Sequence, residues 1–175
     1  MKIIQMTNAT PTQSMGYVVQ AKTGQVLVID GGAKDNDKEL KRIIKSVGSH
    51  VDLWLITHPH SDHHDAVMQV LRNPEGITYD RLGVSQLSDE WAESTGVPAD
   101  AKELIEWNAF AKNLDSRYFD IKNGEVFNLG SMKVEILAVA NPEILDNPFN
   151  NQSVVIRVTE GDFVMLFLGD LGVEA

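Results

Sequence analysis

Apolar and polar positions change their period along the chain, and this change predicts where strands give way to helices. The run from Val26 to Ile29 is continuously apolar, which predicts a strand buried on both faces. Thr23-Gly24 lies just before it, after another segment rich in Val and Tyr, so the two segments are expected to form a hairpin. Strands are predicted at residues 2–6, 15–20 and 25–30.

Helical spacing follows the third of these strands. Leu40, Ile43 and Val47 fall on one face of a helix predicted over Asp35 to Val47. An apolar strand at 51–56 comes next, so strand, helix and strand follow in the order of an α/β crossover. Further helices are predicted at 64–72 and 99–114, with a weak strand at 79–84 between them.

Strand patterns return in the last third of the chain. The dipeptide Asn123-Gly124 separates two of them and predicts a hairpin between them. These strands are expected at 117–121, 125–129, 132–139, 153–159 and 163–168. The whole pattern predicts one α/β domain over residues 1–175.

Composition and charge limit which metal ligands and which partners this chain can have. The chain has no Cys, which excludes disulfides and thiolate ligands, so a metal would need His, carboxylate, amide or water ligands. Its formal net charge of −10 disfavours nucleic acid as a partner. We find neither a secretory signal nor an apolar run of the roughly 18 residues that a membrane span needs, so we expect a cytoplasmic protein without a membrane segment.

The candidate chemistry is concentrated directly after the strand predicted at 51–56. His58, His60, Asp62 and His63 follow one another within six residues, and four of the chain's five His lie between 58 and 64. In an extended segment, residues two apart point to the same side, so His58 and His60 can bind one ion together. A His-rich polar loop is the alternative, but packing does not explain such a cluster at the end of a buried strand. The spacing therefore predicts a metal site.

The run THPHSDHHD resembles the signature of the metallo-β-lactamase superfamily. Asp30-Gly31-Gly32 resembles an Asp-Gly turn upstream of that signature, and Phe167 to Asp170 resembles a late strand that ends in a metal-bridging Asp. The resemblance spans residues 15 to 170 and implies an αββα sandwich with metals at one edge of the sheets. Asp30 would then support a ligand His or simply begin the turn.

The resemblance also implies a ligand set. His58 and His60 would bind a first ion, Asp62 and His63 a second, and Asp170 would bridge the two, with Asp62 and Asp170 taking part in catalysis. One or two divalent ions are expected, Zn before Mn or Fe. A hydroxide held by the metal would attack an ester-type bond.

The sequence departs from the family pattern in two places. The usual third His of the first ion is missing, and Asn150 or Asn151 could offer an oxygen in its place or act only in a turn. The chain also ends five residues after Asp170, so the C-terminal half of the sandwich is expected to be incomplete. An open sheet edge would then favour a homo-oligomer.

Two functions follow from the resemblance and its gaps. The first is a metal-dependent hydrolase of a small-molecule or ester substrate. The stretch from Asn150 to Asp170 resembles the branch of competence-type DNA-uptake proteins, and this favours a phosphodiester. The second is a non-catalytic, degenerate metal-binding domain that acts in an assembly, as the missing His would allow.

Overall fold

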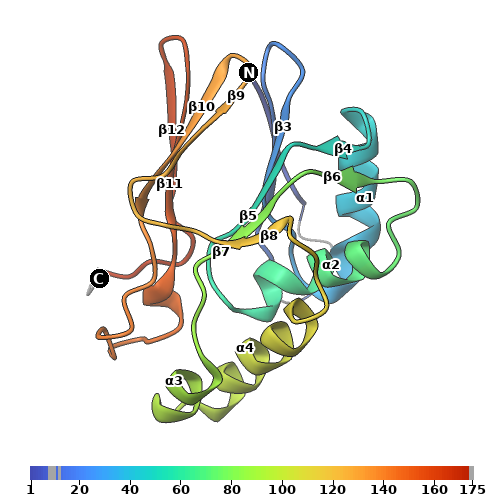
Figure 1. The fold of residues 1–175 in the computed structure, drawn as a ribbon. Coiled ribbons are helices and arrows are strands. Elements are labelled where there is room, and N and C mark those ends of the chain that lie inside the picture. The colour runs from blue at the N-terminus through green and yellow to red at the C-terminus, as the bar shows by residue number, and fades with distance from the viewer. Residues whose placement is uncertain (8–10, 12, 174–175) are drawn as a thin grey trace.

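Two β-sheets lie face to face, and helices cover the outer face of one of them (Figure 1). The computed structural model describes residues 1–7, 11 and 13–173. One apolar core lies between the helices and the first sheet, and a second core lies between the two sheets. The strand Val26–Asp30 contributes to both cores, as its unbroken apolar run predicts.

The first sheet has six strands in the order β1-β2-β3-β5-β7-β8. Their bounds are β1 Lys2–Gln5, β2 Gly16–Gln20, β3 Val26–Asp30, β5 Leu53–Ile56, β7 Leu82–Val84 and β8 Tyr118–Asp120. The first three are antiparallel, whereas β3, β5, β7 and β8 run parallel. The carboxyl ends of the parallel strands therefore meet at one edge of the sheet, which is where sites form in such sheets.

Four α-helices pack outside this sheet or at its lower end (Figure 1). They are α1 Asp37–Ser46, which follows a 3₁₀ turn at Lys34–Asn36, α2 Ser61–Arg72, α3 Asp89–Ser94 and α4 Pro98–Ala111. Leu40, Val67 and Trp107 are each almost fully buried against the sheet side. The helix predicted from Asp35 is thus confirmed with a later start, and α3 was not predicted.

The second sheet has four antiparallel strands in the order β12-β11-β10-β9. Their bounds are β9 Val126–Leu129, β10 Met132–Ala138, β11 Val155–Glu160 and β12 Phe163–Phe167. A 3₁₀ turn at Asn150–Gln152 precedes β11, and a small parallel pair, β4 His50–Val51 and β6 Thr78–Tyr79, lies beside the first sheet. Alternate residues of β10 point inward, which is the period-two pattern of a strand with one buried face.

The outer face of the second sheet is covered by no helix of the described residues (Figure 1). Val164 and Leu166 on the edge strand β12 are 56% and 52% exposed, and Val126 on β9 is exposed as well. An Arg157–Glu135 ion pair crosses the middle of this face. The α/β class with two stacked sheets is confirmed, and the helices of the described residues lie on one side of the two sheets. Association through the β12 edge stays a prediction.

The hairpin predicted around Asn123-Gly124 is wrong. The turn exists, since Glu125 donates its N–H to the carbonyl of Lys122, but β8 pairs with β7 in the first sheet and β9 pairs with β10 in the second. Ile121 and Phe127 are both buried in the core between the sheets. Burial of these two side chains therefore takes the chain from one sheet to the other, where the dipeptide alone suggested two paired strands.

Helix α2 begins at Ser61, three residues before the start at His64 that the sequence suggested. His60 adopts an extended conformation and precedes the first turn. Asp62 and His63 therefore belong to the first turn of the helix itself. None of the helices in the described part of the chain is both long and apolar enough to cross a membrane.

Candidate metal centre

Asp30 and Thr57 form the buried base of the candidate site at the carboxyl ends of β3 and β5. The Thr57 backbone N–H donates to Asp30 Oδ1 at 2.8 Å, and the Thr57 hydroxyl donates to Asp30 Oδ2 at 2.8 Å. Asp30 has a φ of +58° and is fully buried, as is its partner Thr57. The Trp54 indole donates to the Asp30 carbonyl at 3.0 Å and helps to hold this conformation. The Asp30 carboxylate is thus fixed in one orientation.

Asp30 and Thr57 orient two imidazoles in the same way. His63 Nδ1 lies 2.9 Å from Asp30 Oδ2, and His58 Nδ1 lies 3.2 Å from Thr57 Oγ1. Since both acceptors face Nδ1, the proton of each neutral ring belongs there, and each Nε2 keeps its lone pair. A carboxylate or hydroxyl that holds the far nitrogen is the usual arrangement behind a metal-ligating His. These contacts place Asp30 directly behind His63, and its role in supporting a metal ligand stays a prediction.

His60 approaches the same place with its other nitrogen. Its Nδ1 lies 3.1 Å from His58 Nε2, and its Nε2 lies 3.3 Å from Asp100 Oδ2 on α4. Phe149 stacks on the His60 ring at 6.0 Å between centroids. His60 Nε2 is buried and makes no hydrogen bond among the described residues, although the Asp100 carboxylate lies near it. The facing nitrogens of His58 and His60 share a proton in their hydrogen bond, and a metal ion could take the place of that proton.

The first turn of α2 carries the next two candidates. Asp62 Oδ2 lies 3.9 Å from His63 Nε2, and the two residues line a cavity of about 300 Å³ together with Asp170. Glu103 of α4 fixes the start of this turn, because its carboxylate accepts from Ser61 N at 2.7 Å and from Ser61 Oγ at 2.9 Å. A carboxylate at this end of a helix also complements the helix dipole.

Asp170 reaches the site from the turn after β12. Its Oδ1 lies 3.5 Å from His63 Nε2, and its backbone N–H donates to Ser153 Oγ. Gly169 makes this approach possible, because its φ is +56° and a Cβ there would lie 2.5 Å from Ser153 Oγ and 3.0 Å from Thr57 Cβ. Only glycine accommodates both the backbone conformation and the contact.

Burial and neighbouring charges shift the pKa values of these groups in opposite directions. Burial, followed by the charge of His63 and His60, holds the pKa of His58 well below its usual value. Burial also lowers the pKa of His63, but the carboxylates of Asp30 and Asp170 outweigh this and raise it to about 10. The hydrogen bond with His63 lowers the pKa of Asp170 in turn. Without an ion, these shifts favour the protonated, positively charged ring at His63 and a neutral imidazole at His58.

The two Asn residues proposed as an extra ligand differ in their contacts. Asn151 donates to the carbonyl of Asp146 and accepts from Gly172 N–H, so both ends of its amide are used within the fold. Asn150 Oδ1 is buried without a hydrogen-bond partner among the described residues. Its side chain is also close enough to His58 to act on the pKa of that ring. Asn150 is the residue of this pair that can offer an oxygen.

The structure thus brings the five predicted ligands together. Ligand atoms of His58, His63 and Asp170 lie within 4.8 Å of one another, while His60 contacts His58 and Asp62 lies beside His63. Their division between two ions stays a prediction. The supporting residues were missed by the sequence analysis: Thr57, Asp100 and Glu103. Of these, only Thr57 could have been found from the sequence, because it is adjacent to the His cluster. Asp100 and Glu103 lie on α4, far from the cluster in the sequence.

Solved structures of the metallo-β-lactamase fold match the fold of this chain over most of its length. A Staphylococcus aureus metallo-β-lactamase is 17% identical, with 95% of this chain and 42% of that chain covered and a TM-score of 0.57. MEM-A1, a subclass B3 metallo-β-lactamase from a soil metagenome library, is 15% identical over 87% and 55%, with a TM-score of 0.55. The Bacillus subtilis metallo-β-lactamase fold protein YhfI is 15% identical over 94% and 59%, with a TM-score of 0.55.

The chain therefore adopts the metallo-β-lactamase fold. It spans about half the length of these solved structures. No protein-family model matches the sequence, and no curated protein matches it. At these identities the likeness establishes the fold, and the activity has to be argued from the site itself.

Proposed function

We propose that this chain is a metal-dependent hydrolase domain whose active centre is the His58–Asp170 cluster. The observation that supports the proposal is the convergence of three imidazoles and two carboxylates at the carboxyl ends of β3 and β5. Nε2 of His58 and Nδ1 of His60 face each other at 3.1 Å, and the Asp62 and Asp170 carboxylates lie beside His63 Nε2. This donor set suits a divalent ion such as Zn²⁺, with Mn²⁺ or Fe²⁺ as alternatives.

The residues of the site fit one or two ions. The ligand atoms of His58, His63 and Asp170 lie close enough together to hold one ion. With a second ion, His58 and His60 would hold the first, with Asn150 Oδ1, which has no hydrogen-bond partner among the described residues, and Asp62 and His63 would hold the second, with Asp170 shared between the two. Asn150 offers a carbonyl oxygen where the resemblance implies a third imidazole, so the first ion is expected to bind more weakly than in a three-His site. A divalent ion lowers the pKa of a water that it binds toward neutrality and so supplies a nucleophile near pH 7.

The chain's own residues contribute orientation and proton handling. Asp30 and Thr57 hold the Nδ1 protons of His63 and His58, which keeps both Nε2 atoms directed at the site. Asp62 and Asp170 line the neighbouring cavity and are partly exposed. They can accept a proton from an attacking water or pass one to a leaving group.

We favour a small phosphodiester as the substrate. The resemblance of the Asn150–Asp170 stretch to the DNA-uptake branch supports phosphodiester chemistry, while the net charge of −10 disfavours a long nucleic acid. A cavity of about 300 Å³ beside the ligands is in the range of a small-molecule site.

Hydrolysis by protein loaded with Zn²⁺, Mn²⁺ or Fe²⁺ tests the proposal. The substrates are bis(4-nitrophenyl) phosphate, 4-nitrophenyl acetate and a chromogenic β-lactam. We expect turnover of the diester that is lost in His58→Ala and Asp62→Ala but kept in Lys133→Gln, which removes a charge on β10 that pairs with Glu135 on the second sheet. Turnover of the acetate alone would overturn the phosphodiester preference. Metal retention without turnover of any ester would favour the non-catalytic metal-binding domain.

A further inference from the structure

The carboxylates around the candidate metal centre have His rings as their only ion-pair partners among the described residues. These carboxylates belong to Asp30, Asp62, Asp100 and Asp170. Three of them contact His63, at 2.9 to 3.9 Å between a carboxylate oxygen and a ring nitrogen, and Asp100 lies 3.3 Å from a ring nitrogen of His60. The centre therefore gathers negative charge that no Lys or Arg of the described residues balances.

The cavity beside these carboxylates has no basic side chain among the described residues of its lining. It is lined by Gln13, Ser14, Met15, Asp62, His63 and Asp170. The residues outside the described ranges, 8–10, 12, 174 and 175, include no Lys or Arg either. A positive charge close to a substrate in this cavity would therefore come only from the His cluster or from an ion that the cluster binds.

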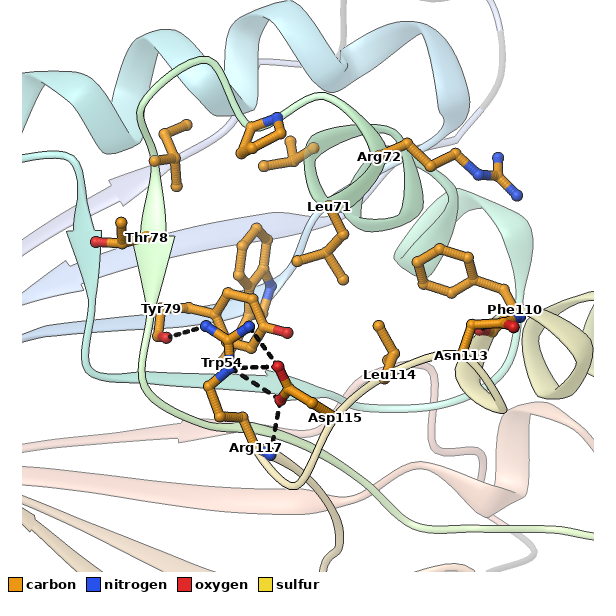
Figure 2. Close-up of a pocket in the computed structure, with 13 residues that line it drawn as sticks. Trp54, Leu71, Arg72, Thr78, Tyr79, Phe110, Asn113, Leu114, Asp115 and Arg117 are labelled. Atoms are coloured by element: carbon orange, nitrogen blue, oxygen red, sulfur yellow. Dashed lines mark hydrogen bonds and ion pairs between the residues drawn. The ribbon is translucent and has the colours of Figure 1, made fainter.

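Basic side chains lie at other hollows of the molecule, beside carboxylates. Figure 2 shows one case on the helix side of the first sheet, where Arg117 and Asp115 line a cavity of about 400 Å³. The Asp115 carboxylate accepts from Arg117 Nε at 2.9 Å and from Nη2 at 2.7 Å, so this guanidinium is neutralised within the fold. Lys34 and Arg72 line a separate hollow between α2 and α4 that also contains two carboxylates. The cavity at the metal centre differs, because it has carboxylates without a Lys or Arg.

We propose that the metal centre takes substrates that carry at most one negative charge, namely phosphodiesters and neutral esters, and rejects dianions such as phosphomonoesters. This inference rests on the proposed hydrolase function and names the charge class of its substrate. Two divalent ions would bring as much positive charge as the four carboxylates bring negative charge, so little net charge would remain to attract an anion.

The second negative charge of a phosphomonoester finds no compensating group in this cavity. Guanidinium and ammonium groups are the side chains with which proteins stabilise additional phosphate oxygens, and the described lining has neither. The partly exposed carboxylates of Asp62 and Asp170 would repel that charge at close range. The field of a chain with a formal net charge of −10 acts in the same direction.

Gln13 is the position at which this selection can be changed without altering a ligand. Its side chain is exposed and lines the cavity, so an Arg at this position can reach a bound phosphate. Asn128 is exposed on β9 of the second sheet and does not line the cavity. Gln13→Arg therefore adds a cation at the substrate, and Asn128→Arg is the matched control that adds the same charge elsewhere.

Binding is measured by phosphorus NMR titration of the full chain loaded with Zn²⁺. At pH 8 methyl phosphate is a dianion, since the second pKa of a phosphomonoester is about 6, and dimethyl phosphate is a monoanion. In the parent we expect the dianion to bind no more tightly than the monoanion. Gln13→Arg should raise the affinity for methyl phosphate about tenfold, the effect of a hydrogen bond to a charged group. Asn128→Arg should change it by less than about twofold, because a distant charge is screened.

Turnover gives a second measurement with methyl 4-nitrophenyl phosphate and 4-nitrophenyl phosphate, which share a leaving group. The ratio of kcat/KM for the monoanion to kcat/KM for the dianion should fall about tenfold in Gln13→Arg and stay the same in Asn128→Arg. A parent that binds methyl phosphate more tightly than dimethyl phosphate would overturn the proposal, as would a Gln13→Arg variant with unchanged affinity and ratio. If the binding results appear as expected but no ester is hydrolysed, the proposed hydrolysis fails and the charge selection stands.

Discussion

Removal of the Glu103 side chain should weaken both the fold and the candidate metal centre. Glu103 accepts two hydrogen bonds from Ser61 at the first residue of α2, at 2.7 and 2.9 Å. In Glu103→Ala the Ser61 N–H and hydroxyl lose a charged partner at a position that is only partly exposed to water. Loss of a helix cap typically costs about 0.5–2 kcal/mol, and bonds to a charged group lie at the upper end, so we expect about 2 kcal/mol.

This loss is measurable as a change in melting temperature. For a domain of this size, 1 kcal/mol corresponds to about 2–4 °C, so Glu103→Ala should melt about 4–8 °C lower. The first turn of α2 also carries Asp62 and His63, and its disturbance should weaken metal affinity by about tenfold, the lower end of the effects seen for residues that support ligands. Calorimetric melting and a competitive metal titration give the two values.

Glu106, one turn after Glu103 on α4, provides a matched control. Glu106 is exposed, and its one ion pair among the described residues is with Lys102 at 3.7 Å, so Glu106→Gln should stay within about 0.5 kcal/mol of the parent. Glu103→Gln keeps one acceptor oxygen and should recover part of the loss. A Glu103→Ala variant that melted and bound metal like the parent would refute the reasoning, because α2 would then begin at Ser61 without its carboxylate cap.

Two further changes probe the turn after β12 and the outer face of the second sheet. Gly169→Ala should destabilise the chain by more than Gly161→Ala, because both glycines have φ near +60° but only a Cβ at residue 169 would clash with Ser153. The backbone strain alone costs about 1–2 kcal/mol in each variant. Equal melting temperatures of the two variants would contradict this prediction. Glu135→Gln should destabilise the chain at pH 7. Hydrogen bonds from Arg157 lower the pKa of Glu135 to about 2, so its contribution is present above the ordinary carboxyl pKa and is lost as pH falls toward 2. Urea unfolding at pH 7 and in acid should show the two proteins converging, and a gap that widens in acid would contradict the account.

Much of the fold could be predicted because its signals are local. The unbroken apolar run of β3 and the helical spacing of Leu40, Ile43 and Val47 follow directly from the burial that the structure shows. The pairing of β8 and β9 could not be predicted, because Asn123-Gly124 describes the turn and not the partners of the strands it joins. Those partners are set by distant burial in the core between the sheets.

Some residues of the candidate site could be predicted from the local sequence, and others could not. The density of His58 to His63 in the sequence identifies the ligands, since they are neighbours both along the chain and in space. Asp100 and Glu103 come from α4, some 40 residues away in sequence, and nothing local marks them as partners of His60 and Ser61. Contacts of this kind depend on how α4 packs against α2, which periodicity alone does not determine.

The central claim is that the His cluster, and not another acidic or His-containing surface, holds the metal. Besides the cluster, one further group among the described residues has ligand atoms within 4.8 Å of one another: His50, Asp52 and Asp80. The direct measurement is the metal content per chain, by elemental analysis after dialysis, of untagged parent, His58→Ala and His50→Ala. We predict one to two equivalents of Zn, Mn or Fe in the parent and in His50→Ala, and their loss in His58→Ala. Metal that stays in His58→Ala, or that leaves with His50→Ala, would contradict the account.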